Sequence, residues 1–268
     1  ISSGSGGIGF ITINEGSLLA SASITALDGT LNNLLINNGN LYGTVHADYN
    51  ILSIRLNGGA VFGDMGVNPA RSSGTPVAGD PYRNQLPPNV IANASIQGPR
   101  ITAGFNIGRI ILTSGSIFEA FIWAGRAIGT IDVTGAITND GITTGQATVI
   151  AAGSSIFTVH ATGNVRGLDV LAGIKDFGAD GVQGGQGANA DTVRSGRITT
   201  VQVDGSADGL HVSAGMDAGA DGVYNTFDEL VVPGISYVRS VTVGGVVSDA
   251  SVFADSPTLV ASPGIITA

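Results

Sequence analysis

A single pattern recurs along this chain and limits the possible folds more than any other feature. In ITTVQVDGSADGLHVSAG, residues 198–215, apolar side chains stand at Ile198, Val201 and Val203. A glycine turn at Gly205 then precedes a second apolar alternation that closes on another glycine. Close or looser copies of the same frame begin at Ile8, Leu31, Ile51, Ile107, Ile128, Ile156 and Val238. Eight copies of one unit predict a repeat protein in which each unit packs on its neighbours.

The period assigns side chains to two faces, because successive residues of a strand point to opposite sides. Two columns of inward positions carry no charge: Ile8, Leu31, Ile51, Ile107, Ile128, Ile156, Ile198, Val238, and Ile11, Leu34, Ile54, Ile110, Ile131, Val159, Val201, Val241. An outward column accepts almost any side chain: Thr12, Leu35, Arg55, Ile111, Asp132, His160, Gln202, Thr242. This contrast predicts a stack of repeats, or rungs, that buries one face.

A third short strand is predicted from residues 148–156, 192–198 and 230–238, each of which leads into the next repeat. We therefore predict an all-β fold, a right-handed parallel β-helix (β-solenoid) with three short strands per rung and about eight rungs, as one domain over residues 1–268. A glycine recurs at one corner: Gly16, Gly39, Gly59, Gly115, Gly135, Gly163, Gly205, Gly245. Such a column indicates either a positive φ or a close approach to the neighbouring rung.

Insertions lengthen some repeats, and we expect them to leave the stack at one corner, after Gly145, Gly173 and Gly215 and near Asn68. Residues 174–192 and 216–229 are acidic insertions. Residues 69–100 hold six of the nine prolines and are predicted to form an irregular excursion. This excursion is either an ordinary surface loop or a contact loop for a neighbouring subunit.

Charge is distributed unevenly along the chain. Six acidic residues balance six basic ones in residues 1–130, whereas fourteen acidic residues face five basic ones in residues 131–268, so the net charge of −9 belongs to the second half. No basic stripe is present, which argues against a nucleic-acid partner. The chain has no cysteine and no apolar run long enough for a transmembrane helix. It begins ISSGSGG, so we expect a processed protein or a piece of a longer one.

The strongest chemical motif is DAGADGVYNTFDE, residues 217–229. It resembles the oxygen-rich calcium loop D-x-[DN]-x-[DN]-G-x₅-E, although glycine stands at position 3 and aspartate at position 12. The predicted ligands are Asp217, Asp221, Asn225 and Asp228 by their side chains and Val223 by its carbonyl oxygen. No flanking helices are predicted, so calcium would bind a loop on a β scaffold.

The preceding insertion opens in the same way, with DFGADG at residues 176–181, and continues to Asp191. Asp176, Asp180 and Asp191 are therefore candidate ligands of a second calcium site. The alternative is a pair of turns rich in aspartate and glycine that bind no metal, because both residues favour turns in any case.

Constellations typical of catalysis are sparse. The three histidines, His46, His160 and His211, lack metal-ligand spacing. His160 lies next to Asp132 in the outward column, where a pair across rungs is one interpretation and two exposed polar residues are the other. Asp204 and Asp208 near His211 suit turn chemistry as well as acid–base chemistry. We therefore predict no enzyme and retain a polysaccharide lyase or hydrolase only as a third alternative.

The string GLHVSAGMDAGADGVYNTFDE with the following repeat VRSVTVGGVVSDASVFAD resembles repeat-rich surface proteins of environmental bacteria. Those proteins carry rungs of the form I-x-x-V-x-V-x-G with DxGxDG calcium-type loops between them, and the resemblance covers residues 127–255. It implies a secreted β-solenoid at the bacterial cell surface with a structural or adhesive role. It adds nothing about catalytic residues.

The expected function is that of an extracellular assembly protein in a surface fibre, stalk or layer, stabilised by calcium. The alternative is an adhesin that binds glycans or another surface. Nothing before Ile8 is typical of a cap, and LVASPGII at residues 259–266 begins another repeat. Because uncapped strand edges add further strands, we expect copies to associate end to end.

Overall fold

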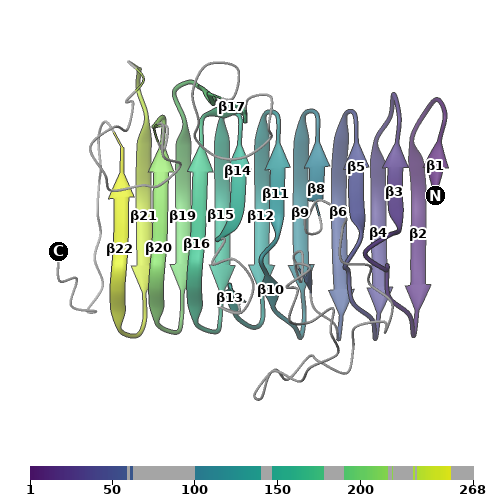
Figure 1. Cartoon of the computed structure of the whole chain (residues 1–268), viewed down its shortest axis with the longest axis horizontal. Helices are drawn as coiled ribbons and strands as arrows, with labels where there is room; N and C mark the ends of the chain where they lie inside the picture. The colour runs from purple at the N-terminus through teal and green to yellow at the C-terminus, as the bar shows by residue number, and fades with distance from the viewer. Residues whose placement is uncertain are drawn as a thin grey trace, which may run out of the picture.

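The computed structural model describes residues 1–58, 61–62, 100–139, 147–177, 190–216, 219, 232 and 234–254. All regular elements in these residues are β-strands (Figure 1), which confirms the predicted all-β class. Two extended sheets face each other along the length of the molecule, and the strands within each sheet are parallel. This arrangement is consistent with a β-solenoid. The described part of the chain contains no helix long and apolar enough to cross a bilayer.

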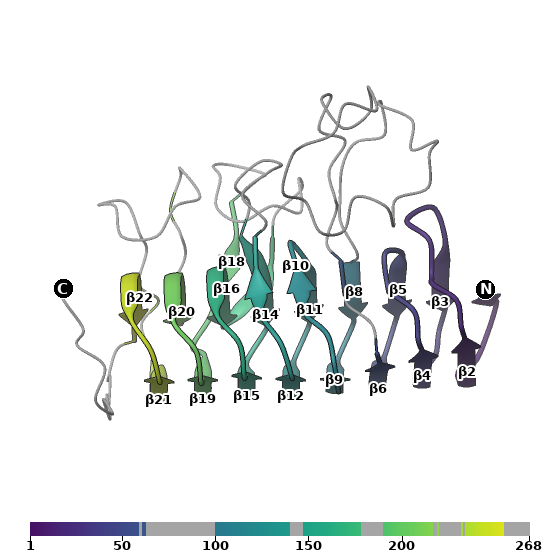
Figure 2. The ribbon, with the colours of Figure 1, turned by 90° about the horizontal axis from the view of Figure 1, so that it is seen from below.

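One sheet has eight strands that lie side by side in chain order (Figure 2). Its members are β2 (Ile8–Asn14), β4 (Leu31–Asn37), β6 (Asn50–Asn57), β9 (Asn106–Leu112), β12 (Ala127–Val133), β15 (Ser155–Ala161), β19 (Arg197–Val203) and β21 (Tyr237–Val243). Each pair is in the register that the repeat predicts, so all three predicted columns are confirmed along the sheet.

The facing sheet has twelve strands. One run comprises β1 (Ser2–Ser3), β3 (Ser23–Ala26), β5 (Thr44–Ala47), β8 (Arg100–Ala103), β11 (Phe121–Ala124) and β14 (Thr148–Ala152). Beside it lie the two-residue strands β7 (Val61–Phe62), β10 (Ile117–Phe118) and β13 (Ile137–Thr138). Both runs join at β16 (Val165–Ala172), which is followed by β20 (Ala207–Ala214) and β22 (Val247–Phe253).

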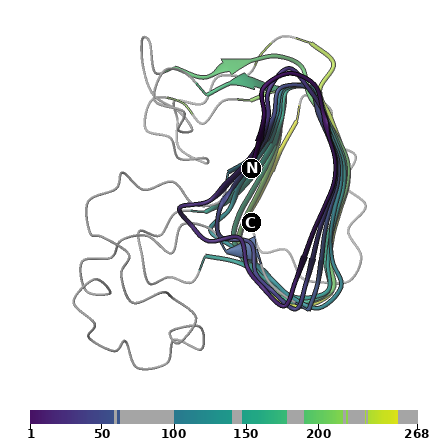
Figure 3. The same ribbon diagram turned by 90° about the vertical axis from the view of Figure 1, so that its right-hand side faces the viewer.

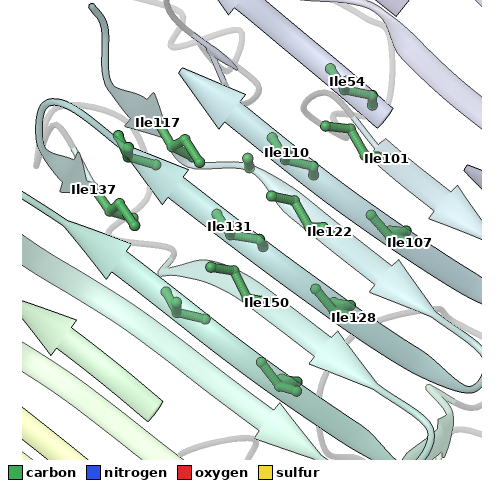
Figure 4. Packing of buried hydrophobic residues seen from close by; sticks show 14 of the residues in the cluster. Ile54, Ile101, Ile107, Ile110, Ile117, Ile122, Ile128, Ile131, Ile137 and Ile150 are labelled. Atoms are coloured by element: carbon green, nitrogen blue, oxygen red, sulfur yellow. The ribbon is translucent and has the colours of Figure 1, made fainter. Parts of the chain in front are cut away.

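The core fills the space between the two sheets. Isoleucines of the eight-stranded sheet, such as Ile110 and Ile131, lie opposite Ile101, Ile122 and Ile150 of the twelve-stranded sheet (Figure 4). All five side chains are fully buried. Aliphatic burial of this kind is the main stabilising contribution, at about 25 cal/mol per Å² of apolar surface removed from water. Because neighbouring strands repeat the same residue types, the core is continuous from repeat to repeat.

The predicted glycine column is a site of close approach and not of positive φ. A Cβ atom on Gly135 would lie 2.2 Å from the carbonyl oxygen of Gly115, and one on Gly39 would meet the carbonyl oxygen of Gly16 even more closely. The described members of the column all lack positive φ. Glycine is therefore needed because the backbone of the neighbouring repeat occupies the place of a side chain. Gly59 lies outside the described residues.

The number of strands per repeat differs from the prediction. Among the described residues, repeats with three strands occur only in the middle of the chain, for example β9, β10 and β11. In the later repeats one longer strand replaces the two short ones, as in β16, β20 and β22. These strands continue through a residue of positive φ: 59° at Gly167, 66° at Gly209 and 46° at Asp249. The left-handed residue bends the strand without interrupting it, so the two runs join into one bent sheet opposite the eight-stranded sheet (Figure 3).

The prediction that all insertions leave at one corner is wrong for the same reason. Residues 63–99 and 140–146 fall between the two runs of the twelve-stranded sheet, after β7 and after β13. The later insertions follow a complete strand, after β16 and after β20, where Gly173 and Gly215 adopt φ values of 99° and 71°. In β16 and β20 the strand is continuous across the bend, so no insertion can leave there. The insertion leaves instead at the turn that leads to the eight-stranded sheet.

Candidate functional site

The predicted calcium ligands lie mostly outside the described residues. This applies to Asp217, Asp221, Val223, Asn225, Asp228 and Asp180. Within the calcium-type motif at residues 217–229 only Gly219 is described, and its φ of 76° lies in the left-handed region that favours glycine. Among the described residues, no three acidic or histidine side chains are grouped so that they could hold a metal ion. The calcium sites therefore stay a prediction.

Two predicted ligands, Asp176 and Asp191, lie at the base of the acidic insertion at residues 174–192. Strand β17 (Ile174–Asp176) pairs with β18 (Thr192–Val193) in an antiparallel hairpin, and Asp176 is the register partner of Thr192. Asp191 directly precedes Thr192, so the hairpin brings the two aspartates to the same end. Asp176 is exposed and Asp191 is half-buried. The metal site that these two residues would share stays a prediction.

A second apolar cluster fixes this hairpin on the outer face of the twelve-stranded sheet. The ring of Phe177 meets that of Phe121 edge to face, with centroids 5.1 Å apart, and Trp123 Nε1 donates to the carbonyl oxygen of Ile174 at 3.3 Å. Buried Leu171 and Ile174 complete the contact. The repeat did not reveal this cluster because its aromatic residues do not recur from each repeat to the next along the outward columns. The only sequence feature that indicates this cluster is FIWA, residues 121–124, in which the outward-facing residues Phe121 and Trp123 are also apolar.

Arg194 joins the same hairpin to the turns between the two sheets. Its guanidinium donates from Nε to the carbonyl oxygen of Gly153 and from Nη2 to that of Gly125 at 3.2 Å. A cation that binds turn carbonyls of two repeats holds the base of the insertion in a defined place. The acidic insertion is therefore attached to the stack by apolar contacts and by charge-assisted hydrogen bonds.

Polar side chains also form columns across the strands. Asn37 Nδ2 donates to Asn14 Oδ1 at 2.9 Å, and Asn57 Nδ2 donates to Asn37 Oδ1 at 2.8 Å. The Asn37 amide donates to one neighbour and accepts from the other, so the ladder stabilises β2, β4 and β6 in register. These asparagines act between repeats.

Of the two interpretations of Asp132 and His160, the structure shows the pair across repeats, and a third residue joins it. His160 Nδ1 lies 2.8 Å from Asp132 Oδ1, and His160 Nε2 lies 3.2 Å from Asp204 Oδ2. Gln202 Nε2 donates to the other carboxylate oxygen of Asp204 at 2.8 Å. Asp132 belongs to β12, His160 belongs to β15, and Asp204 directly follows β19. All three lie on the outer face of the eight-stranded sheet. Asp204 was not predicted as a partner because it lies beyond its strand.

Charge and burial act in opposite directions on this imidazole. Desolvation lowers the pKa of His160, but the hydrogen bonds and charges of Asp132 and Asp204 outweigh it and raise the pKa above the ordinary 6.5. The hydrogen bond from Gln202, followed by that to His160, lowers the pKa of Asp204 below 3.8. Both shifts favour the charged forms, an imidazolium between carboxylates.

The row of polar residues on β16, β20 and β22 is a second place with catalytic residue types. Asp169, His211 and Ser251 are register partners on neighbouring strands, and His211 Nδ1 lies 2.6 Å from Ser251 Oγ. Burial lowers the pKa of His211, although Asp249 opposes the shift. A neutral imidazole accepts a hydrogen bond from the hydroxyl group of Ser251 or donates one to it, according to its tautomer. The row crosses three neighbouring strands of the twelve-stranded sheet.

Comparisons with protein-family models, with curated proteins and with solved structures find no match to this chain.

Proposed function

We propose that this chain is a non-enzymatic structural protein that assembles into a fibre, stalk or layer on the outside of a bacterium. In this proposal the two sheets form a right-handed β-solenoid of about eight rungs, whose copies associate end to end. Calcium binds the acidic insertions and makes them rigid. The resemblance to repeat-rich bacterial surface proteins supports the location, and the state of the core columns at the outermost strands supports the assembly.

One core column is fully buried inside the stack and only partly buried at the outermost described strands. In the column from Leu34 to Val201 each side chain is at most 1% exposed. At the outer strands β2 and β21 the same column continues with Ile11 and Val241, which are only partly buried. In this proposal another stack with the same columns buries these side chains and pairs with the outer edges that β2 and β21 have in the described part of the chain. The neutral first half and the acidic second half favour head-to-tail contacts.

A lysine at one outer strand tests this assembly. We expect the mass of the native protein in sedimentation equilibrium to rise with concentration, and Ile11→Lys to remain monomeric because a charge at the open column opposes stacking. Thr12→Lys is the matched control, since Thr12 faces outward on the same strand and should assemble like the native chain. A native protein that sediments as a monomer at every concentration contradicts the proposal.

Calcium should raise the melting temperature of the native chain. A ligand that binds only the folded form stabilises it by mass action, by about 2.7 kcal/mol at a concentration of 100 Kd. We expect the double variant Asp217→Ala/Asp221→Ala to lose most of this rise. Asp208→Ala, which removes an aspartate outside the two insertions, should keep it. The absence of calcium uptake up to millimolar concentrations in calorimetric titration would end the calcium part of the proposal.

A glycan-binding adhesin is the alternative function, and one observation favours it. Tyr49 and Phe105, at the turns between the two sheets, are each 46% exposed, and their ring centroids lie 5.6 Å apart. Exposed aromatic faces on neighbouring repeats offer a surface on which sugar rings stack. A glycan array distinguishes the functions, because binding that disappears in Tyr49→Ala/Phe105→Ala but persists in Phe157→Ala identifies an adhesin.

A further inference from the structure

The three histidines of this chain have different partners, and the partners determine how many protons each ring needs. His46 Nε2 faces Asp48 Oδ1 at 2.9 Å and His46 Nδ1 faces Thr102 Oγ1 at 2.7 Å. A hydroxyl group donates or accepts, so a neutral ring satisfies both contacts. His211 faces the hydroxyl group of Ser251, and a neutral ring satisfies that contact too.

His160 is different, because both of its ring nitrogens face carboxylates. An ionised carboxylate only accepts hydrogen bonds, so the contacts to Asp132 and Asp204 both need an N–H on the ring. Only the imidazolium carries two. Loss of one proton would direct a nitrogen lone pair at a carboxylate oxygen and replace an ion pair by a repulsive contact. The side chain of His160 is 25% exposed, so solvent screens this contact only in part.

The location of these contacts gives them a structural consequence. Asp132 belongs to β12, His160 to β15, and Asp204 directly follows β19. The insertion between β13 and β14 interrupts the repeat between the first two strands, and the acidic insertion at residues 174–192 interrupts it between the second and the third. Backbone pairing in the eight-stranded sheet continues across both interruptions, and His160 adds a charged link at the same two junctions.

We propose that Asp132, His160 and Asp204 form a proton-dependent clamp that holds together the three repeats between which the two insertions leave the stack. The charged groups that face the ring in the described part of the chain are Asp132 on one side and Asp204 on the other. Gln202, which donates to Asp204, is neutral and keeps that carboxylate in place. The clamp is closed when the imidazole carries two protons and both carboxylates are ionised.

The pH dependence follows from linkage. Since the folded-state pKa of His160 is raised above 6.5, the clamp contributes all of its stability below pH 6.5 and loses it as the pH rises through the folded pKa. At the acidic end, Asp204 keeps its charge until the pH falls below its ordinary pKa of 3.8. The clamp therefore stabilises the native state in mildly acidic solution, and this contribution is lost in alkaline solution.

Nuclear magnetic resonance titration of the full chain tests the clamp, because the protein has only three histidines. We expect His160 to lose its proton at a higher pH than His211, whose pKa is lowered by burial. In Asp132→Asn/Asp204→Asn the His160 titration should move to lower pH, since the amides remove both charges. Asp28→Asn, which leaves these carboxylates in place, is the control and should not move it.

Hydrogen exchange supplies the readout for the link between repeats. In the native chain we expect the amides of β12, β15 and β19 to exchange faster, after correction for intrinsic rates, as the pH rises above 6.5. His160→Gln should remove this added pH dependence while β2 and β4 behave as before. An unchanged His160 titration in the double asparagine variant, or the same pH dependence with and without His160, would overturn the proposal.

Discussion

Val201→Asp should destabilise the protein by more than about 3 kcal/mol, the largest effect that we expect from a single substitution. Val201 is fully buried between Val159 and Val241 in a column that contains only aliphatic side chains. No cation or hydrogen-bond donor of the core columns is available to a carboxylate at this place. The free energy of unfolding, measured by denaturant titration at constant m, reports the loss.

The control for this experiment is one residue away. Gln202 faces outward and donates one hydrogen bond to Asp204, so Gln202→Asp replaces an exposed contact and adds a neighbouring like charge. We expect a cost of about 1 kcal/mol or less. Two variants with the same midpoint would contradict the assignment of inward and outward positions, which is the basis of the whole fold.

Gly135→Ala should cost about 1–3 kcal/mol, although it adds only one methyl group. The new Cβ atom would lie 2.2 Å from the carbonyl oxygen of Gly115 and 2.8 Å from its carbonyl carbon. Both are backbone atoms of the neighbouring repeat, so no side-chain rotation relieves the contact. The substitution therefore forces two repeats apart at a corner where hydrogen bonds hold them together.

Gly9→Ala is the matched control, because no heavy atom lies within 4 Å of the place where its Cβ atom would be. This substitution should be neutral or stabilise the protein by about 0.4–1 kcal/mol, since alanine reduces the freedom of the unfolded chain. Thermal or chemical denaturation of both variants gives the comparison. Equal midpoints for Gly135→Ala and Gly9→Ala would show that close approach is not what requires glycine in the column.

The eight-stranded sheet could be predicted almost completely from the sequence, and the reason is physical. Ile8, Leu31 and Ile51 occupy equivalent places in successive repeats, and a continuous aliphatic core selects the same residue type at each of them. The period of the pattern therefore contains the register. The glycine column was predicted as well, although only the structure distinguishes close approach from positive φ.

The shape of the twelve-stranded sheet could not be predicted in the same way. Whether a repeat contains one bent strand or two short ones depends on the left-handed conformation of single residues such as Gly167 and Gly209. Glycine is frequent throughout this chain, so its presence alone does not identify a bend. Asp249 adopts the same conformation without being glycine, which no pattern of glycines indicates.

The candidate sites also differ in how much of each one the repeat pattern predicts. Register alone places His160 next to Asp132, because both belong to one outward column. Asp204 reaches the ring from beyond the end of β19, and such a contact depends on a turn and on side-chain rotamers. The hairpin of β17 and β18 and the adjoining Phe177 contact Trp123 and Phe121 through residues that do not recur in the other repeats. The repeat pattern therefore does not predict this contact.

The most direct test of the proposed assembly is electron microscopy of the purified chain in the presence of calcium. Our account predicts rods that lengthen with protein concentration and show a spacing of about 4.7–4.9 Å along the axis, the distance between paired strands. The Ile11→Lys variant should give only short particles under the same conditions. A field of single-chain particles for the native protein at every concentration would contradict the account and favour the glycan-binding adhesin.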